Sequence, residues 1–393
     1  MKILADENIP LLESLFGTFG DVIPVSGSDI TPRRLKGVEA LLVRSVTPVD
    51  EALIAGSSLR FVGSATAGID HIELPALVRR GIRFAHAPGS NADSVADYVL
   101  CALLVLAAAD LSRLADMTIG VVGVGNVGKR VARRSRALGM RVACCDPPRV
   151  IAGDTDDDTT SRSDFLAFHE LLDVSDVVTL HVPLERGGEH PTWHLVGAEA
   201  LRHARPNVWL LNTARGSVVD NRALLDFVSK QTDARCVLDV WEGEPLPDVE
   251  LMRRADVGTP HIAGYSWDAK VAGARAVARD LSDHLGIENE AINTPLEPVR
   301  LSVDSIGLAD SELAVIGRLA RAMYDIEADA RSLQDTLGLS SDERSRRFRE
   351  LRRDYPSRRG FEAHVIRFTD PPTSDVVRRL SAALNVRTEA QVS

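Results

Sequence analysis

Cysteine is scarce in this sequence. Only 4 cysteines occur among 393 residues, and none of them forms a CxxC pair. They lie in apolar runs, at Cys101, Cys144, Cys145 and Cys236. Such positions favour buried thiols over a metal site or a disulfide framework. We therefore expect no metal centre and a cytoplasmic protein.

The sequence also lacks a long uninterrupted apolar run. Its first residues, MKILADENIP, carry Asp6 and Glu7 where a secretion signal needs apolar side chains. The longest apolar stretch begins at Tyr98, and it falls well short of the roughly 20 residues that cross a bilayer. This stretch predicts a buried helix, and we expect no membrane partner.

Positive charge is in deficit. The formal net charge is −10 and the pI is near 5.5. Nucleic acids and anionic membranes reward a basic surface, so we expect neither as a partner. Lysine is rare and most of the positive charge comes from arginine, whose planar guanidinium group suits carboxylate and phosphate ligands.

Apolar residues are plentiful enough to build large cores. They make up 45% of the chain, and the mean hydropathy is −0.03. Because a single core stops growing near roughly 250 to 300 residues, a chain of 393 residues predicts two or three domains.

Strand-like and helical patterns alternate through most of the chain. Up to about Pro88 the strand-like runs are KILAD, DVIPV, ALLVRS, RFVGSAT and IRFAHA. After an apolar helix predicted over roughly 91–111, a second series follows: TIGVVGVG, RVACCD, VVTLHV, VWLLNT, RCVLDV and VGTP. Strands separated by helices predict parallel sheets covered on both faces. The expected fold class is α/β.

A different pattern follows the helix predicted from Trp267 to Leu285. The segment GIENEAINTPLEP has no periodicity and is typical of a linker. Beyond it we predict a long helix around 310–337, a charged helix over 342–354, the strand HVIRF and the helix SDVVRRLSAAL. This small α+β module has little mass for a core, so we expect it to dock on another chain. The acidic stretch 153–163 predicts a solvated surface loop without a function.

A glycine motif follows the strand TIGVV and precedes a helical pattern. It is GVGNVG, with Gly123, Gly125, Asn126, Val127 and Gly128. Such glycines permit a tight turn, close approach of the backbone to a pyrophosphate, and tight packing of helix on strand. The start of the helix adds unpaired N–H groups and a positive dipole. The motif predicts dinucleotide binding; a glycine turn without a ligand is the alternative.

An acidic residue stands where the ribose of a dinucleotide is read. Asp146 ends the next strand, about 20 residues on, where a carboxylate can accept hydrogen bonds from the ribose and repel a 2'-phosphate. The sequence therefore predicts NAD rather than NADP, although Arg149 nearby leaves some room for NADP.

Three segments at successive strand ends carry groups that suit the oxidation of a hydroxy acid. Arg215 follows VWLLN, Glu244 follows the strand that Asp239 ends, and His261 follows the next. The carboxyl edge of a parallel sheet is where ligands bind. Here a guanidinium can hold a carboxylate, and Glu244 can orient His261 for proton exchange. Each residue alone also fits a structural role, but their order behind a dinucleotide motif favours a site.

These segments resemble a known family. GVGNVG, NTARGSVVD, DVWEGEP and TPHIAGY are similar to the signatures of the D-isomer-specific 2-hydroxyacid dehydrogenases. MKILADENIP, VRSVT, GSATAGIDH, CDPPR and LRRDYPSRRGF resemble the members that act in bacterial vitamin B6 synthesis. The resemblance implies NAD-dependent oxidation of 4-phospho-D-erythronate at C2, which gives (R)-3-hydroxy-2-oxo-4-phosphooxybutanoate.

The resemblance also implies roles for individual residues. Arg215 would bind the carboxylate, Glu244 would orient the histidine, and His261 would be the acid/base. Ser45, Thr66 and Tyr265 would contact substrate. The cofactor would be lined by Asp146, Val182, Thr213, Ala214, Asp239 and Gly264, with only a backbone contact expected from Val182.

The substrate phosphate needs a cation of its own. Arg44, beside Ser45 at a sheet edge, is our preferred ligand. The alternative is the arginine cluster at Arg352, Arg353, Arg358 and Arg359. Ser45 and Thr66 also fit a simpler role as residues that cap turns.

The implied architecture has three parts. A flavodoxin-like substrate domain over 1–92 is completed by about 268–290, a Rossmann NAD-binding domain spans 93–267, and a small α+β dimerisation domain spans 291–393. The expected assembly is a homodimer. Two alternatives stay open: a dehydrogenase for another 2-hydroxy acid such as 3-phosphoglycerate, and a dinucleotide-sensing binding protein.

Overall fold

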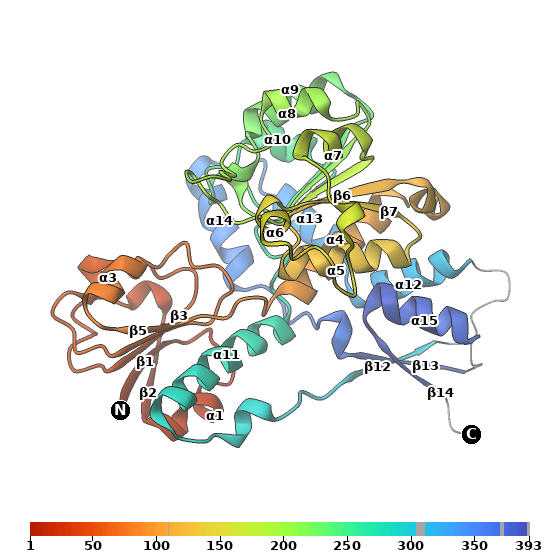
Figure 1. Cartoon of the computed structure of the whole chain (residues 1–393). Helices are drawn as coiled ribbons and strands as arrows, with labels where there is room; N and C mark the ends of the chain where they lie inside the picture. Colours follow the sequence, from red (N-terminus) through yellow and green to blue (C-terminus); the bar gives the residue numbers. More distant parts are fainter. Residues whose placement is uncertain (109, 304–310, 370–372, 391–393) are drawn as a thin grey trace. The chain divides into compact units, whose positions relative to one another are not determined.

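The fold is built on parallel sheets. A computed structural model describes residues 1–108, 110–303, 311–369 and 373–390 (Figure 1). The chain forms two compact units. The N-terminal unit comprises Met1–Ala92 and Tyr265–Glu297, and the large unit comprises Asp93–Gly264 and Pro298–Ser393. The predicted α/β class is confirmed.

The N-terminal unit is a five-stranded parallel sheet in the order β2-β1-β3-β4-β5. Its strands are β1 (Lys2–Asp6), β2 (Asp21–Val25), β3 (Ala40–Val43), β4 (Phe61–Ser64) and β5 (Arg83–Ala85). This is the strand order of flavodoxin-like folds, as predicted. The central strands β3 and β4 are buried along their whole length, because helices cover both faces of the sheet.

Four helices cover this sheet, two on each face. They are α1 (Leu12–Phe16), α2 (Glu51–Ile54), α3 (Leu74–Arg79) and α11 (Trp267–Leu285). Side chains of α1 and α11 share one apolar cluster with Ile3 and Phe61. Side chains of α2 and α3 share the other with Leu4 and Val62. The alternation of apolar side chains along each strand thus supplies both cores.

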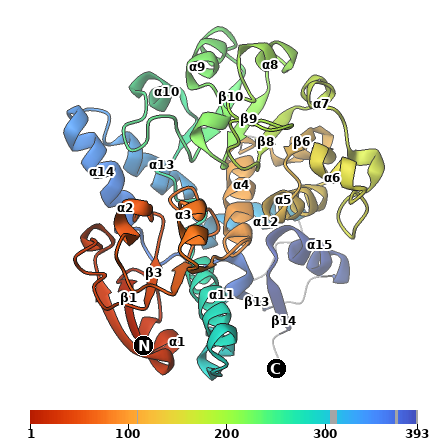
Figure 2. The same cartoon turned by 60° about the vertical axis from the view of Figure 1, so that its left-hand side comes forward.

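The large unit contains a six-stranded parallel sheet in the order β11-β10-β9-β8-β6-β7. Its strands are β6 (Thr118–Val122), β7 (Arg141–Cys145), β8 (Val177–Leu180), β9 (Trp209–Asn212), β10 (Arg235–Leu238) and β11 (Val257–Gly258). Strands β8, β9 and β10 lie side by side in Figure 2. The chain runs from β6 to the edge strand β7 and then returns to the other side of β6. Ligands of open α/β sheets bind at such a reversal.

One helix precedes this sheet in the chain, and others join its strands. The first is α4 (Ala92–Leu106), and the others are α5 (Asn126–Ala137), α6 (Pro147–Ala152), α7 (Phe168–Val174), α8 (Ala198–His203), α9 (Asn221–Lys230) and α10 (Val249–Arg254). Helix α4 ends at Leu106, several residues before the predicted end, and a 3₁₀-helix (Leu111–Asp116) follows. No helix in the described part of the chain is long and apolar enough to span a membrane.

The C-terminal segment adds a three-stranded parallel sheet in the order β12-β13-β14 to the large unit. The strands are β12 (Val299–Val303), β13 (His364–Phe368) and β14 (Arg387–Ala390), and the helices are α12 (Glu312–Met323), α13 (Ile326–Gln334), α14 (Ser341–Arg353) and α15 (Ser374–Leu384). Helix α15 packs against α5, where the guanidinium of Arg379 donates to the carbonyl of Ala137 at 2.8 Å.

The prediction of one long helix around 310–337 is wrong. Residue 310 lies outside the described residues, and two helices, α12 and α13, occupy the rest of the range. Tyr324 between them is extended, with φ −150° and ψ 111°. The side chain of Asp325 then caps α13 by accepting from the N–H of Ala328 at 3.0 Å. The apolar periodicity predicted one continuous helix, but Asp325 favours an N-cap position, and a new helix begins after it.

Candidate active site

Each glycine of the GVGNVG motif meets a different local demand. Gly123 follows β6 with φ +84°, and a Cβ there would lie 2.8 Å from the carbonyl carbon of His181. A Cβ at Gly128 would lie 2.0 Å from the carbonyl oxygen of Gly123. At Gly125, by contrast, an added Cβ meets no described atom within 4 Å. Two glycines are thus required by the turn and by packing, and the middle one faces open space.

The same turn offers an anion a place to bind. Gly125 is the N-cap of α5, and no side chain caps this helix. The first N–H groups of a helix have no partners within it, and the helix dipole makes this end positive. The open face at Gly125 therefore fits the pyrophosphate of a dinucleotide. Asn126 and Val127, also predicted in the site, form the first residues of α5.

Asp146 ties the glycine turn to the end of β7. Its Oδ2 accepts from the N–H of Val124 at 2.8 Å, and its Oδ1 accepts from the N–H of Arg149 at 3.2 Å. The second contact caps α6. The Arg149 guanidinium is engaged elsewhere, with Asp157 at 3.1 Å and the carbonyl of Val124 at 3.0 Å. Asp146 is thus the charge presented where the sequence predicts the ribose.

The stretch 153–163 is a surface loop with internal hydrogen bonds. Thr155 and Thr160 are buried, and Asp157 accepts from the N–H groups of Thr159 and Thr160, both at 2.8 Å. Asp157 also pairs with Lys129 of α5 at 2.8 Å. Burial raises the pKa of Asp157, but these hydrogen bonds and cations outweigh it, so the net pKa lies well below the ordinary value. Most residues of the stretch are exposed, as expected of a surface loop, but hydrogen bonds to its own aspartates and two buried threonines hold its backbone.

His181 and Val182 follow β8 beside the glycine turn. An added Cβ at Gly123 would also lie 2.8 Å from Cγ1 of Val182. The Nδ1 of His181 lies 3.3 Å from the hydroxyl of Thr213, and its Nε2 lies 3.0 Å from the hydroxyl of Thr179. Burial lowers the pKa of His181 to about 3, so this ring is neutral. A neutral histidine therefore links the loop after β8 to Thr213 in the loop after β9.

Arg215 is placed by a buried asparagine. The side-chain amide of Asn212, at the end of β9, donates to the carbonyl of Arg215 at 2.9 Å. Its Oδ1 accepts from the N–H of Ala214 at 3.0 Å. One side chain therefore fixes the loop that holds Thr213, Ala214 and Arg215. The sequence reasoning missed Asn212, although it stands directly at the strand end.

Gly216 joins this loop to the one after β10. A Cβ at Gly216 would lie 2.0 Å from the carbonyl oxygen of Trp241. The backbones of the two loops are therefore in direct contact. The Trp241 ring is buried, and its Nε1 donates to the carbonyl of Thr259 at 2.9 Å. The loops after β9, β10 and β11 thus form one packed edge.

Glu244 and His261 form the predicted pair. The Nδ1 of His261 lies 2.8 Å from Oε2 of Glu244, and Oε1 of Glu244 accepts from the N–H of Trp241 at 2.8 Å. Burial raises the pKa of Glu244, but the adjacent His261 and these hydrogen bonds outweigh it, so the pKa lies below its ordinary value. The Nε2 of His261 makes no hydrogen bond within the described ranges. This nitrogen is available to a ligand.

Asp239 holds the backbone that carries His261. Its Oδ1 accepts from the hydroxyl of Thr259 and the N–H of Ile262, both at 2.7 Å, and its Oδ2 accepts from the N–H of Ala263 at 3.0 Å. Burial raises the pKa of Asp239 above its ordinary value, although the adjacent His261 and these hydrogen bonds act to lower it. His261 itself has φ +60°. Such a left-handed conformation is costly for histidine and persists only when its surroundings enforce it.

The predicted substrate residues belong to the N-terminal unit. The guanidinium of Arg44 lies over the ring of Tyr265, 5.7 Å from its centroid. The ammonium of Lys270 lies 5.1 Å from the same centroid. Lys270 was missed, because only the fold of α11 brings it beside the Tyr265 ring. Two cations therefore flank one aromatic side chain.

Ser45 and Thr66 differ in their surroundings. Ser45 is exposed. The Thr66 hydroxyl donates to the carbonyl of Gly68 at 2.9 Å and lies 2.7 Å from the Ser64 hydroxyl. Thr66 thus caps a turn after β4, the simpler role that its sequence position also allowed.

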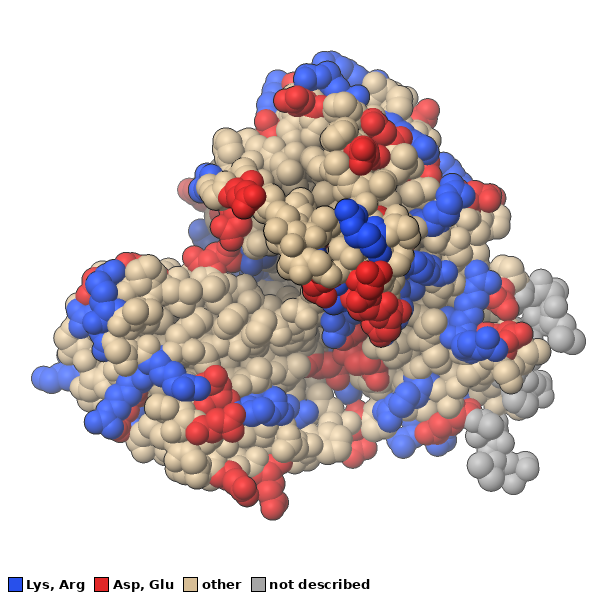
Figure 3. All heavy atoms as spheres, viewed as in Figure 1, with Lys and Arg blue, Asp and Glu red and all other residues tan. Residues whose placement is uncertain are grey.

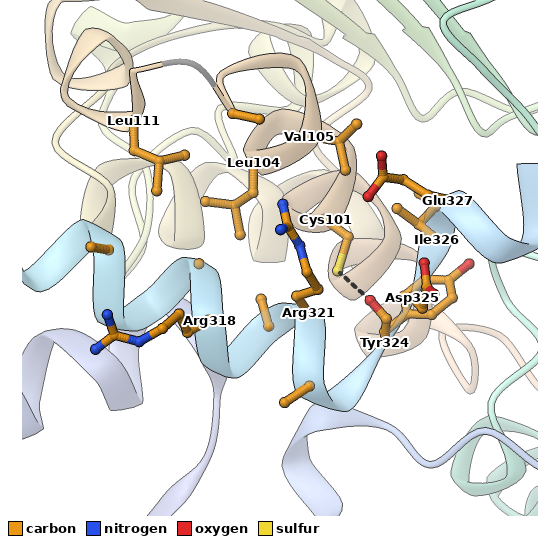
Figure 4. Close-up of a pocket in the computed structure, with 15 residues that line it drawn as sticks. Cys101, Leu104, Val105, Leu111, Arg318, Arg321, Tyr324, Asp325, Ile326 and Glu327 are labelled. Carbon is orange, nitrogen blue, oxygen red and sulfur yellow. Dashed lines mark hydrogen bonds between the residues drawn. The ribbon is translucent and has the colours of Figure 1, made fainter. Parts of the chain in front are cut away.

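A hollow elsewhere in the large unit has different properties. It has a volume of about 530 Å³ and lies along α4 and α12 (Figure 4). Its apolar wall includes Leu104, Val105 and Leu111, and Tyr324 and Arg321 also line it. None of the predicted site residues is among the described residues that line it. This hollow is not the site of the chemistry.

Comparison with known proteins identifies the family. Residues 106–263 match the D-isomer specific 2-hydroxyacid dehydrogenase, NAD binding domain. A protein named erythronate-4-phosphate dehydrogenase from Salinibacter ruber is 46% identical over 376 residues, which cover 95% of each chain. One of the same name from Azotobacter vinelandii is 44% identical and covers 97% of this chain and 99% of its own length. The chain belongs to the erythronate-4-phosphate dehydrogenase family. The resemblance seen in the motifs is confirmed.

Solved structures agree on the fold. The TT0316 protein from Thermus thermophilus is 28% identical, with a TM-score of 0.61 over 74% of this chain and 99% of its own. The D-lactate dehydrogenase of Aquifex aeolicus, solved with NAD and lactic acid, is 24% identical, with a TM-score of 0.59 over 72% of this chain and 96% of its own. A domain of unknown function matches residues 302–381. Membership of this family makes the chain an NAD-dependent dehydrogenase, as predicted.

Proposed function

We propose that this enzyme oxidises 4-phospho-D-erythronate at C2, with NAD as the electron acceptor, to (R)-3-hydroxy-2-oxo-4-phosphooxybutanoate. The product would enter pyridoxal phosphate synthesis. The observation that carries this proposal is the Glu244–His261 pair, held at one packed edge with the loop of Arg215 in a chain of this family.

The chain's own groups account for the proton. Nε2 of His261 would accept the proton of the C2 hydroxyl, while Glu244 stays charged and stabilises the imidazolium through its short contact to Nδ1. The C2 hydrogen leaves as hydride to NAD when NAD is bound. The proton on His261 then passes to solvent, which balances the oxidation.

We assign the carboxylate of the substrate to Arg215. A guanidinium can bind a carboxylate through two parallel hydrogen bonds and polarise the forming carbonyl. Asn212 supports this role because it holds the loop at the N–H of Ala214 and at the carbonyl of Arg215. Gly123, Gly125, Gly128, Asp146 and the residues beside them would hold NAD.

We assign the substrate contacts of the N-terminal unit to Ser45, Thr66 and Tyr265, and the phosphate to Arg44 with Lys270. The Arg44 guanidinium makes no ion pair with the carboxylates of the described chain. An anion that neutralises it is therefore favoured. The alternative arginine cluster is less suited to bind the phosphate, since Arg358 donates to Ser94 and Arg353 pairs with Asp354.

We further propose a homodimer in the cytoplasm, with the C-terminal segment supplying much of the interface. The four cysteines are free and buried, which suits a reducing compartment. On the face drawn in Figure 3, acidic and basic side chains are interspersed among uncharged areas, which suits contacts with protein and a small molecule.

The decisive experiment compares two substrates. NADH formation is followed with 4-phosphoerythronate and with 3-phosphoglycerate, and we expect kcat/KM to favour the former by at least about 10-fold. Arg44→Ala and Lys270→Ala should lower kcat/KM for phosphorylated erythronate more than for unphosphorylated erythronate. Preference for 3-phosphoglycerate would assign the enzyme to the other hydroxy acid. NAD binding without turnover of either would favour a sensing role.

A further inference from the structure

The turn that carries His261 is held on its carbonyl side as well as its N–H side. The N–H groups of Ile262 and Ala263 donate to the buried Asp239. The carbonyl of Ala263 accepts from the Ser94 hydroxyl at 2.8 Å and from Nη2 of Arg358 at 3.1 Å. This short turn therefore lies between a buried carboxylate and a guanidinium that is distant in sequence.

Only one nitrogen of the Arg358 guanidinium, Nη2, has hydrogen-bond partners among the described residues. Its Nη2 also donates to the Ser94 hydroxyl at 2.9 Å. Its Nε and Nη1 are buried, and neither has a hydrogen-bond partner in the ranges that the structure describes. Burying an unpaired donor costs free energy, and an apolar side chain of similar volume often stabilises a core as well or better. Of the two hydrogen bonds from its guanidinium, one reaches the backbone of the turn that carries His261 and the other goes to Ser94, which donates to the same carbonyl.

The surroundings of Arg358 keep its guanidinium in place. Its central carbon lies 3.9 Å from the centroid of the Tyr324 ring, a distance that suits a cation–π contact. The hydroxyls of Tyr324 and Tyr355 both donate to Oδ2 of Asp329, at 2.9 and 2.7 Å. The aromatic platform is therefore itself fixed by hydrogen bonds.

The segment that bears Arg358 is also anchored to α4. The N–H of Phe361 donates to Oδ2 of Asp97 at 3.0 Å, and Asp97 pairs with Arg134 of α5. Ser94, which shares the Ala263 carbonyl with Arg358, stands one turn earlier on α4. The segment 355–361 thus reaches the catalytic turn from a fixed position.

We propose that Arg358 is a positioning residue for His261. Arg358 binds the carbonyl of Ala263, while Asp239 binds the N–H groups of Ile262 and Ala263. Together these hydrogen bonds fix the left-handed backbone of His261 and so the direction of its imidazole. Arg358 touches neither substrate nor cofactor in this role, which rests on the proposed use of His261 as the acid/base. The C-terminal segment thereby contributes to catalysis as well as to assembly.

The test replaces the guanidinium while retaining an apolar side chain over Tyr324. We expect Arg358→Met to lower kcat on the order of 10- to 100-fold with KM changed by less than about 3-fold, because a small misplacement of a reacting group has this effect. Arg378→Met is the matched control, since Arg378 is exposed and pairs with Asp375 of its own helix. The control should keep wild-type kcat; an equal loss in both variants would overturn the proposal.

A second measurement does not depend on the substrate. The protonation of His261 is followed by NMR in full-length protein with labelled histidine, its signal being identified by its loss in His261→Ala. We expect the midpoint to move to lower pH in Arg358→Met, because a displaced imidazole loses part of the stabilisation from Glu244. An unchanged midpoint together with wild-type kcat would overturn the proposal. If wild-type protein oxidises neither hydroxy acid, the function fails, yet the midpoint still reports on Arg358.

Arg358→Lys decides the matter if the methionine variant does not fold. Lysine keeps the charge but not the planar fork. We expect a folded enzyme with a kcat below wild type and a His261 midpoint moved in the same direction. Wild-type values of both would show that only charge and bulk are needed, and would overturn the proposal.

Discussion

Nδ1 of His261 lies 2.8 Å from a carboxylate oxygen of Glu244, across 17 residues of sequence. The pKa of Glu244 is below its ordinary value, so the carboxylate is charged at neutral pH and favours the protonated imidazole. Glu244→Gln removes this charge. Because oxidation needs the neutral imidazole, we expect the acid limb of the kcat/KM profile to move to lower pH, with a lower kcat. A limb that moves to higher pH would contradict the role of Glu244.

His261 should be needed for turnover but not for cofactor binding. We expect His261→Ala to lose at least about 100-fold in kcat, the usual contribution of a positioned acid/base. NADH binding, measured by fluorescence titration, should stay within about 3-fold, since the glycine turn is built by other strands. A variant with near wild-type turnover would remove His261 from the mechanism.

Asp146 should set the preference for NAD. Its carboxylate would repel the 2'-phosphate of NADP, so we expect Asp146→Ala to narrow the ratio of kcat/KM between NAD and NADP. The hydrogen bond from Val124 is lost in the same variant, and Asp146→Asn, which keeps an acceptor there, separates the two effects. Equal use of both cofactors by the wild type would refute the assignment.

Gly216 should be intolerant of even a methyl group. A Cβ there would lie 2.0 Å from the Trp241 carbonyl oxygen, so the loops after β9 and β10 must separate. We expect Gly216→Ala to lower stability by about 1 to 3 kcal/mol, the usual cost of overpacking, and to reduce kcat, because Arg215 and Glu244 belong to those loops. Gly187→Ala, where the added Cβ meets no described atom within 4 Å, is the control for thermal melts and kinetics.

The C-terminal segment should be needed for dimerisation. We expect sedimentation of the full-length protein to give a dimer, and a chain ending near Thr294 to lose it. Helix α15 packs on α5 through Arg379, so the shortened chain also needs a circular-dichroism check of its fold. A folded, shortened protein that still dimerises would place the main interface elsewhere, such as on α4.

The sequence predicted the sheets well because their signals are local. The strands β1 and β2 and the helix α11 have the predicted bounds, since apolar runs between turn residues mark strands and a Ser266 cap marks the helix. The Glu244–His261 contact was predictable from strand ends, because consecutive parallel strands finish at one edge.

The missed features depend on tertiary structure. Asn212 reads as an ordinary polar residue after a strand, and only the folded loop shows that it bonds both Ala214 and Arg215. Arg358 was considered only as an alternative ligand of the phosphate, yet its guanidinium lies over the Tyr324 ring with Nε and Nη1 buried. Neither periodicity nor spacing records which side chains meet from distant parts of a chain.

The way α11 completes the N-terminal unit also fixes an order of events during synthesis. Ile3, Leu42 and Phe61 share one core with Val277 and Leu281 of this helix. When residues 1–92 leave the ribosome, α1 can pack on that face of their sheet but α11 cannot, whereas all six strands of the large unit's Rossmann sheet are made by Gly258. Domains fold as units during synthesis. The unit that begins the chain therefore stays incomplete while the Rossmann sheet forms, and the apolar side chains that α11 covers stay exposed until α11 emerges.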